Sequence, residues 1–410
     1  MIIILTHGRL LDCVGDEPRE DVSVVVEGKI IKDIYTGKRP LPAGATVINV
    51  GGRTVLPGLT DAHMHCTYTD FRLGATTAPT IMRAVKIIQN LELDLEAGFT
   101  TVCDKDGANW ALKRAVEDKI VMGPRLLISS SMISKTCGHA DLSNFRDGTG
   151  EAVLKDTGLI TLSRIADGVD DCRKAARERL RNGADVLKIA ATGGAGTPND
   201  EITDVGYSEE EMRVFVEEAE DNGKYVAAHC LNSKGIKRAI KSGVRSIDHG
   251  IGFDEEAVQM LKERDFFHVP TLMVYKRIAQ RGHEIGAPEY YVRKAITALD
   301  EAMRSTELTY KLKCNAGFGT DCGVGWHGTQ ANELKLRTEC GMKPYEAIKS
   351  ATVVNARLFR MEDTIGTIEI GKWADIITVD GRPDEDIELL GKASNVRLVI
   401  KSGEIVKNTL

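Results

Sequence analysis

The sequence lacks a signal for membranes, secretion or nucleic acids. None of its apolar runs is long enough to span a bilayer, and the apolar residues 1–6 have neither the basic flank nor the small-residue cleavage site of a signal peptide. Positive charge is not in excess: the net charge is -6, which gives no electrostatic reason to bind nucleic acid or an anionic membrane. We therefore expect a cytoplasmic protein with no nucleic-acid or membrane partner.

The sequence also lacks a Cys-x-x-Cys pair. Its nine cysteines are an odd number and are widely scattered, which disfavours both a disulfide framework and a structural zinc site. The hydrophobic fraction of 42% and the charged fraction of 28% are typical of a globular protein that buries a sizeable core. The 410 residues suffice for a large barrel with a small appendage.

Two kinds of pattern divide the chain. Near both ends, short runs rich in Val and Ile are broken by glycine turns, which is typical of small antiparallel sheets. We expect residues 1–57 and 359–410 to form one small β-sandwich domain. The segment between them, residues 58–358, alternates apolar runs of strand length with amphipathic helical stretches.

The middle segment predicts an α/β fold of the (β/α)8 TIM-barrel type. One helix should begin at a capping box of Ser208 and Glu211 and another should end at Gly243. About eight repeats of strand and helix indicate a closed parallel barrel. An open doubly wound sheet is disfavoured because no G-x-G-x-x-G opens the first unit. The expected strands cover residues 59–63, 101–103, 125–129, 186–190, 225–228, 246–247, 268–272 and 317–319.

A histidine pair in the first expected strand is the most specific chemical signal. His63 and His65 stand two positions apart in Pro-Gly-Leu-Thr-Asp-Ala-His-Met-His, so an extended backbone points both side chains to one face. Two imidazoles on one face make half of a site for a metal such as zinc. Taken alone, the pair is a weak signal and is more often two ordinary surface or core histidines.

Four more residues stand at the ends of later expected strands: Lys188, His229, His249 and Asp321. In a TIM barrel the carboxyl ends of all strands face the active-site mouth, so these side chains should meet the histidine pair there. Each also has an ordinary alternative as a capping aspartate, a hydrogen-bonded core histidine or a lysine paired with an acid. Their shared position favours a metal site.

Lys188 needs a separate argument because an ammonium group cannot bind a metal. Burial lowers the pKa of a lysine, and the neutral amine can react with carbon dioxide to give a carbamate. That carbamate has two oxygens, one for each of two metals. A lysine in a buried ion pair is the alternative.

These residues, in this order, resemble the binuclear branch of the amidohydrolase superfamily over nearly the whole chain. Three segments are similar to its prolidase-like group, which contains Xaa-Pro dipeptidases, carboxypeptidases that release arginine or lysine, and an ochratoxin-degrading amidase. The segments are Ile-Ser-Lys-Thr-Cys-Gly-His-Ala-Asp at 133–141, Lys-Ile-Ala-Ala-Thr-Gly-Gly at 188–194, and Val-Pro-Thr-Leu-Met-Val-Tyr at 269–275.

The resemblance implies two divalent metal ions, with zinc as the first choice. Six residues would share them: His63, His65 and Asp321 on the first metal, His229 and His249 on the second, and Lys188, N6-carboxylated by CO2, between both. A hydroxide held between the metals would attack the amide.

The resemblance also implies roles for residues around the metals. Asp321 would move the proton from the hydroxide to the leaving amine, Tyr275 would help hold the developing oxyanion, and His139 would contact substrate. The loop that carries Trp326 and His327 departs from the family pattern, and both side chains could line the substrate pocket or merely cover the barrel mouth. Residues 144–156 replace a longer insertion of the relatives, so the pocket shape should differ.

The resulting hypothesis is an enzyme that acts on a small-molecule or dipeptide substrate and hydrolyses the amide bond of a dipeptide or an N-acyl amino acid. A cyclic amidase uses the same kind of metal site, so this activity remains an alternative. A deaminase is disfavoured, because Cys-Leu-Asn follows His229 where mononuclear deaminases carry a glutamate and because one metal needs no bridging lysine. A barrel that has lost catalysis should have lost ligands, whereas all six remain. Relatives often form homo-oligomers, so a homo-oligomer is a possible state of this chain as well.

Overall fold

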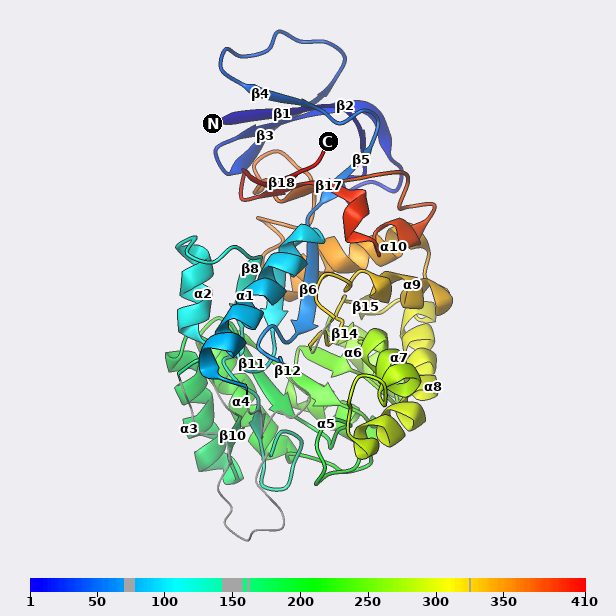
Figure 1. Ribbon diagram of the computed structural model, residues 1–410. Coiled ribbons are helices and arrows are strands. Elements are labelled where there is room, and N and C mark those ends of the chain that lie inside the picture. The colour runs from blue at the N-terminus through cyan, green and yellow to red at the C-terminus, as the bar shows by residue number, and fades with distance from the viewer. Residues whose placement is uncertain (70–77, 142–157, 161–162, 324–325) are drawn as a thin grey trace. The chain divides into compact units, whose positions relative to one another are not determined.

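The computed structural model describes residues 1–69, 78–141, 158–160, 163–323 and 326–410 (Figure 1). The predicted pocket-shaping segment 144–156 lies outside these residues. The chain divides into two compact units, of which the first comprises Met1–Asp61, Glu92–Thr101 and Gly328–Leu410 and the second comprises Ala62–Leu91 and Val102–His327. The domain limits expected from the sequence, 1–57 with 359–410 and 58–358, stay a prediction.

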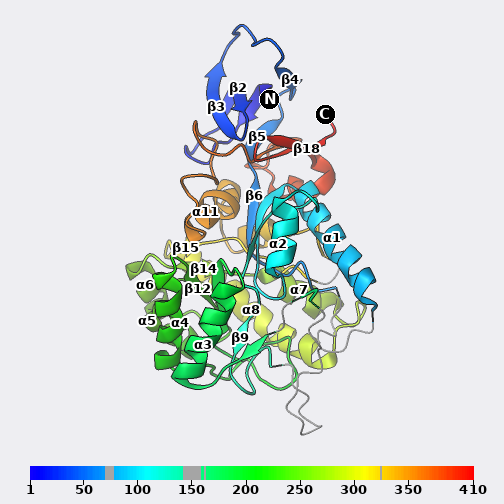
Figure 2. The ribbon, with the colours of Figure 1, turned by 90° about the vertical axis from the view of Figure 1, so that its left-hand side faces the viewer.

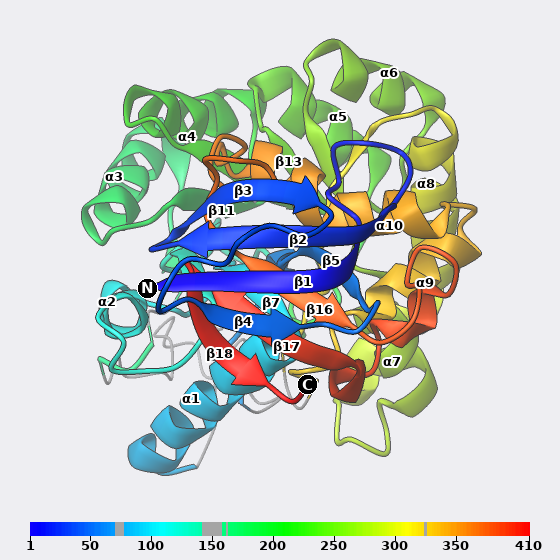
Figure 3. The same ribbon diagram turned by 90° about the horizontal axis from the view of Figure 1, so that it is seen from above.

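The first unit contains one mixed sheet built from both ends of the chain (Figure 3). Its strands are β1 (Ile2–Leu10), β2 (Arg19–Glu27), β3 (Ile30–Thr36), β4 (Thr46–Asn49), β5 (Thr54–Pro57), β16 (Ile376–Val379), β17 (Val396–Lys401) and β18 (Glu404–Asn408). Their order is β18-β17-β16-β5-β1-β2-β3, with β4 on β1. Apolar side chains of both ends, among them Val24 and Ile400, share one buried cluster. The predicted small β-domain from both termini is confirmed.

Short helical segments complete the first unit. They are α9 (Asn332–Glu339), α10 (Pro344–Lys349), a π-helical turn (Ser350–Val354), α11 (Asn355–Leu358) and two 3-10 turns (Ile387–Leu389 and Ala393–Asn395). Helix α1 (Thr80–Glu96) has residues in both units. Among the described residues, no helix combines the length and the apolar character needed to cross a bilayer.

Eight strands form the barrel, and they follow the predicted order. They are β6 (Leu59–Met64), β7 (Phe99–Asp104), β8 (Arg125–Ile128), β11 (Val186–Ala190), β12 (Tyr225–Cys230), β13 (Ser246–His249), β14 (Phe267–Val269) and β15 (Asn315–Ala316). The ring closes where Asp185 N–H donates to the Ile128 carbonyl at 2.7 Å and Ala62 N–H donates to the Phe318 carbonyl at 2.8 Å. The predicted TIM barrel is confirmed. Two short strands, β9 (Ile133–Ser134) and β10 (Arg164–Ile165), extend the edge at β11.

Helices follow the barrel strands, and α3 to α6 form a row of neighbours (Figure 2). The helices are α2 (Trp110–Glu117), α3 (Gly168–Arg181), α4 (Glu209–Asp221), α5 (Ser233–Ser242), α6 (Glu255–Glu263), α7 (Leu272–Arg281) and α8 (Glu289–Lys311). The predicted capping box is present, since Ser208 Oγ accepts from Glu211 N–H while the Glu211 carboxylate accepts from Ser208 N–H. Apolar side chains of α3 to α6 pack on β11 to β13 in one core cluster.

Two expected strands differ from the structure. The strand expected at 268–272 ends at Val269, because Pro270 has no N–H to donate and α7 begins at Leu272. The strand expected at 317–319 is observed as β15, two residues earlier. Residues after β15 nevertheless complete the barrel edge, since Gly317 N–H donates to the His268 carbonyl at 2.8 Å.

The end of α5 gives a test of local strain. Gly243 has φ 98°, and a Cβ there would lie 3.0 Å from Val216 Cγ1. Gly223, with φ 68°, has no neighbour within 4 Å of such a Cβ. We expect Gly243→Ala to lower the free energy of unfolding by about 1–3 kcal/mol and Gly223→Ala to lower it less. Urea denaturation measures both, and equal losses would show that contact with Val216 is unimportant.

Candidate active site

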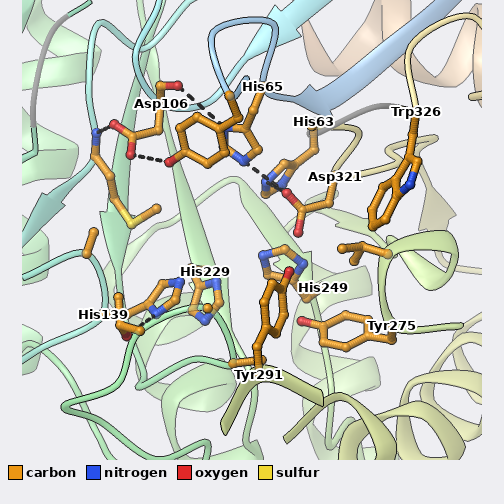
Figure 4. A pocket seen from close by; sticks show the side chains of 18 residues that line it. His63, His65, Asp106, His139, His229, His249, Tyr275, Tyr291, Asp321 and Trp326 are labelled. Atoms are coloured by element: carbon orange, nitrogen blue, oxygen red, sulfur yellow. Dashed lines mark hydrogen bonds and ion pairs between the residues drawn. The ribbon is translucent and has the colours of Figure 1, made fainter. Parts of the chain in front are cut away.

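The residues predicted to bind metal converge at the carboxyl ends of the barrel strands, all within the second unit. Five of them line one cavity (Figure 4): His63, His65, His229, His249 and Asp321. The space between its walls amounts to about 930 Å³ with open solvent included, and concave, largely apolar sites of this kind are where small molecules bind. Lys188 is fully buried and reaches this cluster through Asp248, whose Oδ2 lies 3.1 Å from His63 Nδ1.

Three of these residues form a group that could hold a metal ion. Nitrogen atoms of His63 and His249 and a carboxylate oxygen of Asp321 lie within 4.8 Å of one another. His65 belongs to the same group of donors, because its Nε2 lies 2.9 Å from Asp321 Oδ1, while His63 Nε2 lies 3.5 Å from that oxygen. Although burial acts against it, hydrogen bonds from His63 and His65 hold the pKa of Asp321 well below its usual range. Asp321 is therefore an anion, as a metal ligand must be.

His229 lies beside this group, next to its member His249. Their ring centroids are 4.6 Å apart, and those of His249 and His63 are 4.7 Å apart. His249 Nδ1 contacts Thr271 Oγ1 at 2.7 Å and His229 Nε2 contacts the Gly193 carbonyl at 3.2 Å, so each ring has one nitrogen held by an oxygen and the other left for a metal. Burial lowers the pKa of both histidines well below the ordinary value. Both rings are thus neutral, the form that ligates metals.

Two of the cluster residues have an unusual backbone. His249 has φ 63° and Asp321 has φ 53°, whereas most side chains avoid this left-handed region. In a regular strand, successive side chains point to opposite faces. The left-handed backbone at His249 ends this alternation, so its side chain lines the cavity although the preceding residue, Asp248, already points into the barrel toward Lys188. Strain of this kind is retained where surrounding structure fixes it and is typical of functional sites.

Two buried lysines surround Asp248. Lys188 donates a hydrogen bond to its carboxylate, and Lys105 Nζ lies 4.0 Å from the same oxygen. Burial lowers the pKa of Lys188, and the charge of Lys105 lowers it further, while Asp248 acts in the opposite direction. The buried ion pair, which the sequence left open as the alternative for this lysine, is thus present for the unmodified side chain. Its carboxylation stays a proposal.

The walls of the cavity are mostly aromatic and apolar. Tyr275 on α7 is buried, and its ring centroid lies 6.0 Å from that of His249. Trp326 also lines the cavity, whereas its predicted companion His327 is buried and is not among the described lining residues. His139 lines the cavity and stacks on His229 with ring centroids 4.1 Å apart. None of the described residues that line the cavity is a lysine or an arginine.

Sequence reasoning missed several side chains here. Tyr68 stacks on His65 at 4.3 Å and donates a hydrogen bond of 2.7 Å to Asp106. Tyr291 on α8 lines the same cavity (Figure 4). Asp248 could have been found, because it stands two positions after the buried Ser246 on the same strand and so points into the barrel. No sequence signal placed Tyr291, since α8 comes between strands and has no motif.

Comparison with known proteins decides the family. Residues 54–406 match the amidohydrolase family. The chain belongs to this family. A solved prolidase in complex with N-methylphosphonate-L-proline is 36% identical with a TM-score of 0.94, and a Xaa-Pro dipeptidase with bound methionine is 32% identical with a TM-score of 0.90; each comparison covers 100% of both chains. Ochratoxinase from Aspergillus niger is 31% identical over 99% of this chain and 87% of the relative.

The amidohydrolase motifs proposed from the sequence thus correspond to a real relationship, which includes the prolidase-like group. The histidine and aspartate group at the barrel mouth is consistent with the metal site of this family. The individual roles assigned to the site residues stay predictions.

Proposed function

We propose that this amidohydrolase cleaves the amide bond of a dipeptide or an N-acyl amino acid with the help of two divalent metal ions. The convergence of His63, His249 and Asp321 within 4.8 Å at one cavity carries the proposal. It is further supported by similarity over the whole chain to a prolidase and a Xaa-Pro dipeptidase and to an ochratoxinase.

The donor set fits two divalent metals. Imidazole nitrogens and a carboxylate oxygen are ligands that zinc accepts. In the proposal, His63, His65 and Asp321 would hold one ion, His229 and His249 would hold the other, and Lys188, once carboxylated, would serve as a further ligand. When bound, such ions supply a water that is deprotonated near neutral pH and polarise the substrate carbonyl.

The remaining steps fall to the side chains of the chain. Asp321 takes a proton from the attacking water on its carboxylate and passes it to the leaving nitrogen, which must be protonated to depart. The Tyr275 hydroxyl donates to the oxygen that develops negative charge. Burial raises the pKa of Tyr275 well above its ordinary value, and the charge of Asp321 adds to this effect, so the hydroxyl keeps its proton. His139 contacts the substrate beside His229.

A substrate screen tests the proposal. Zinc-loaded protein is incubated with Xaa-Pro, Xaa-Arg and Xaa-Lys dipeptides, N-acyl amino acids, cyclic amides and nucleobase analogues, and products are followed by mass spectrometry and ammonia release. Cleavage of a dipeptide or N-acyl amino acid, lost in the apoprotein, supports it. Ring opening alone would favour a cyclic amidase, and ammonia from a nucleobase analogue with a single bound metal would favour a deaminase.

Removal of one hydroxyl tests the role of Tyr275. We expect Tyr275→Phe to lower kcat by roughly 10²–10³-fold, the loss typical of one oxyanion donor, while KM changes little. The phenyl ring keeps the apolar contact with the edge of His249, so the unfolding temperature should stay near that of the wild type. An unchanged kcat would remove Tyr275 from the mechanism and leave it as an aromatic packed at the barrel rim.

A further inference from the structure

His139 enters the cavity from a loop without regular structure, so something else must fix its ring. One face of the ring stacks on His229 at an interplanar angle of 20°. The ring also lies close to the backbone of Gly194, where a Cβ would lie 2.2 Å from His139 Nδ1. The ring is therefore in contact with a proposed metal ligand, beside which Figure 4 shows it, and with the loop that follows β11.

The Nδ1 edge of His139 faces an anion. Asp200 Oδ2 lies 3.2 Å from Nδ1 and Thr197 Oγ1 lies 3.0 Å from it. Asp200 is itself fixed, because its Oδ2 accepts from Gly194 N–H at 2.6 Å and its Oδ1 accepts from the Thr197 hydroxyl. A carboxylate that accepts from Nδ1–H orients the ring and leaves Nε2 for another partner.

A buried lysine from a distant helix holds this loop. Lys294 on α8 is 1% exposed. It donates to the carbonyl of Gly194 at 3.1 Å, to that of Thr197 at 2.8 Å and to that of Asp200. Its Nζ also lies 3.5 Å from Asp200 Oδ1. Because burying an unpaired ammonium is costly, these contacts account for the burial and tie the loop to α8.

We infer that Asp200 and Lys294 are positioning residues that act through His139. Asp200 sets the orientation of the His139 ring by accepting from Nδ1–H, so that Nε2 is presented to the substrate. Lys294 fixes the loop that carries Asp200. No lysine or arginine is among the described residues lining the cavity, so histidine rings are the only basic side chains among these described residues. Only one part of this inference rests on the proposed function, namely that the partner of His139 Nε2 is the substrate.

Kinetics on the best substrate of the screen test this arrangement. We expect Asp200→Ala to lower kcat/KM by roughly 10–100-fold, as is typical when the partner of an active-site histidine is removed, mainly through a higher KM. Asp200→Asn keeps an oxygen acceptor and should recover most of the loss. In a His139→Ala background, Asp200→Ala should have no further effect, because residues that act as a unit are not additive.

The ion pair of Arg293 and Glu201, the sequence neighbours of Lys294 and Asp200, offers a matched control. Arg293 and Glu201 join the same helix and loop at 2.7 Å, but both are exposed and neither contacts His139. Glu201→Gln should leave kcat and KM near wild type, since exposed ion pairs contribute little. Lys294→Met should raise KM as Asp200→Ala does. Additive losses for Asp200 and His139, or an equal effect of Glu201→Gln, would overturn the inference.

A spectroscopic measurement separates this inference from the proposed function. A hydrogen-bonded, buried imidazole N–H exchanges slowly and gives a downfield proton resonance, assigned here by its loss in His139→Ala. The resonance should be lost in Asp200→Ala and kept in Glu201→Gln, even if the protein hydrolyses no amide. Persistence of the resonance in folded Asp200→Ala would overturn the positioning role, and failure of the substrate screen alone would overturn only the function.

Discussion

Asp321→Asn is expected to lower kcat/KM by at least about 10³-fold. The carboxylate has two proposed tasks, to ligate metal and to move a proton, and loss of general acid–base catalysis alone contributes roughly 10²–10⁴-fold. Asparagine keeps the size of the side chain and tolerates the left-handed backbone at φ 53°, so the fold should persist. Steady-state kinetics with metal analysis of the same samples measure the effect.

The control for this variant is an aspartate that lies outside the site and has the same left-handed backbone conformation. Asp265 has φ 52° and is exposed. Asp265→Asn should therefore leave kcat/KM near wild type. If Asp321→Asn kept its metal and lost less than about 10-fold in kcat/KM, Asp321 would be neither the proton carrier nor an essential ligand.

Lys188→Ala is expected to remove one or both metal ions and to lower kcat/KM by at least about 10³-fold. The bridging carbamate cannot form without the amine, and the charge stabilisation that metals give amounts to several kcal/mol. Compared with the metal-free wild type, whose Lys188 is a plain ammonium, the variant should also be destabilised by about 3–5 kcal/mol, because Asp248 loses a buried partner. Metal analysis and denaturant unfolding are needed together to separate the two effects.

Lys105→Met provides the matched control for Lys188. Both lysines are fully buried, and both lie near the same oxygen of Asp248. We expect Lys105→Met to lower stability and to retain the metals. If instead Lys188→Ala bound as much metal as Lys105→Met, Lys188 would be only a counterion of Asp248.

Much of the site could be predicted because it depends on strand ends. Each barrel strand is a short apolar run, so the residue at its carboxyl end can be read from the sequence, and barrel closure then brings His63 near Asp321 across more than half of the chain. The helix ends at Ser208 and Gly243 were equally local, since capping and a left-handed glycine depend on neighbouring residues.

The parts that sequence reasoning missed depend on contacts between elements far apart in the chain. Lys294 meets the loop of Asp200 almost a hundred residues away, and no periodicity or motif in α8 marks it. The charge pairing of Lys188 with Asp248 similarly depends on the spacing of β11 and β13 across the barrel, whereas the apolar run around Lys188 predicts only a buried lysine and not its partner. The early end of β14 is a local effect, because Pro270 directly after the strand has no N–H to donate.

A crystal structure of the zinc-reconstituted protein, with anomalous scattering recorded at the zinc edge, would show whether two metal ions bind at the barrel mouth. We expect two anomalous peaks, one among His63, His65 and Asp321 and one beside His229 and His249, with added density on Lys188 Nζ reaching both. A plain Lys188 still bonded to Asp248, with one peak or none at the cavity, would contradict this expectation.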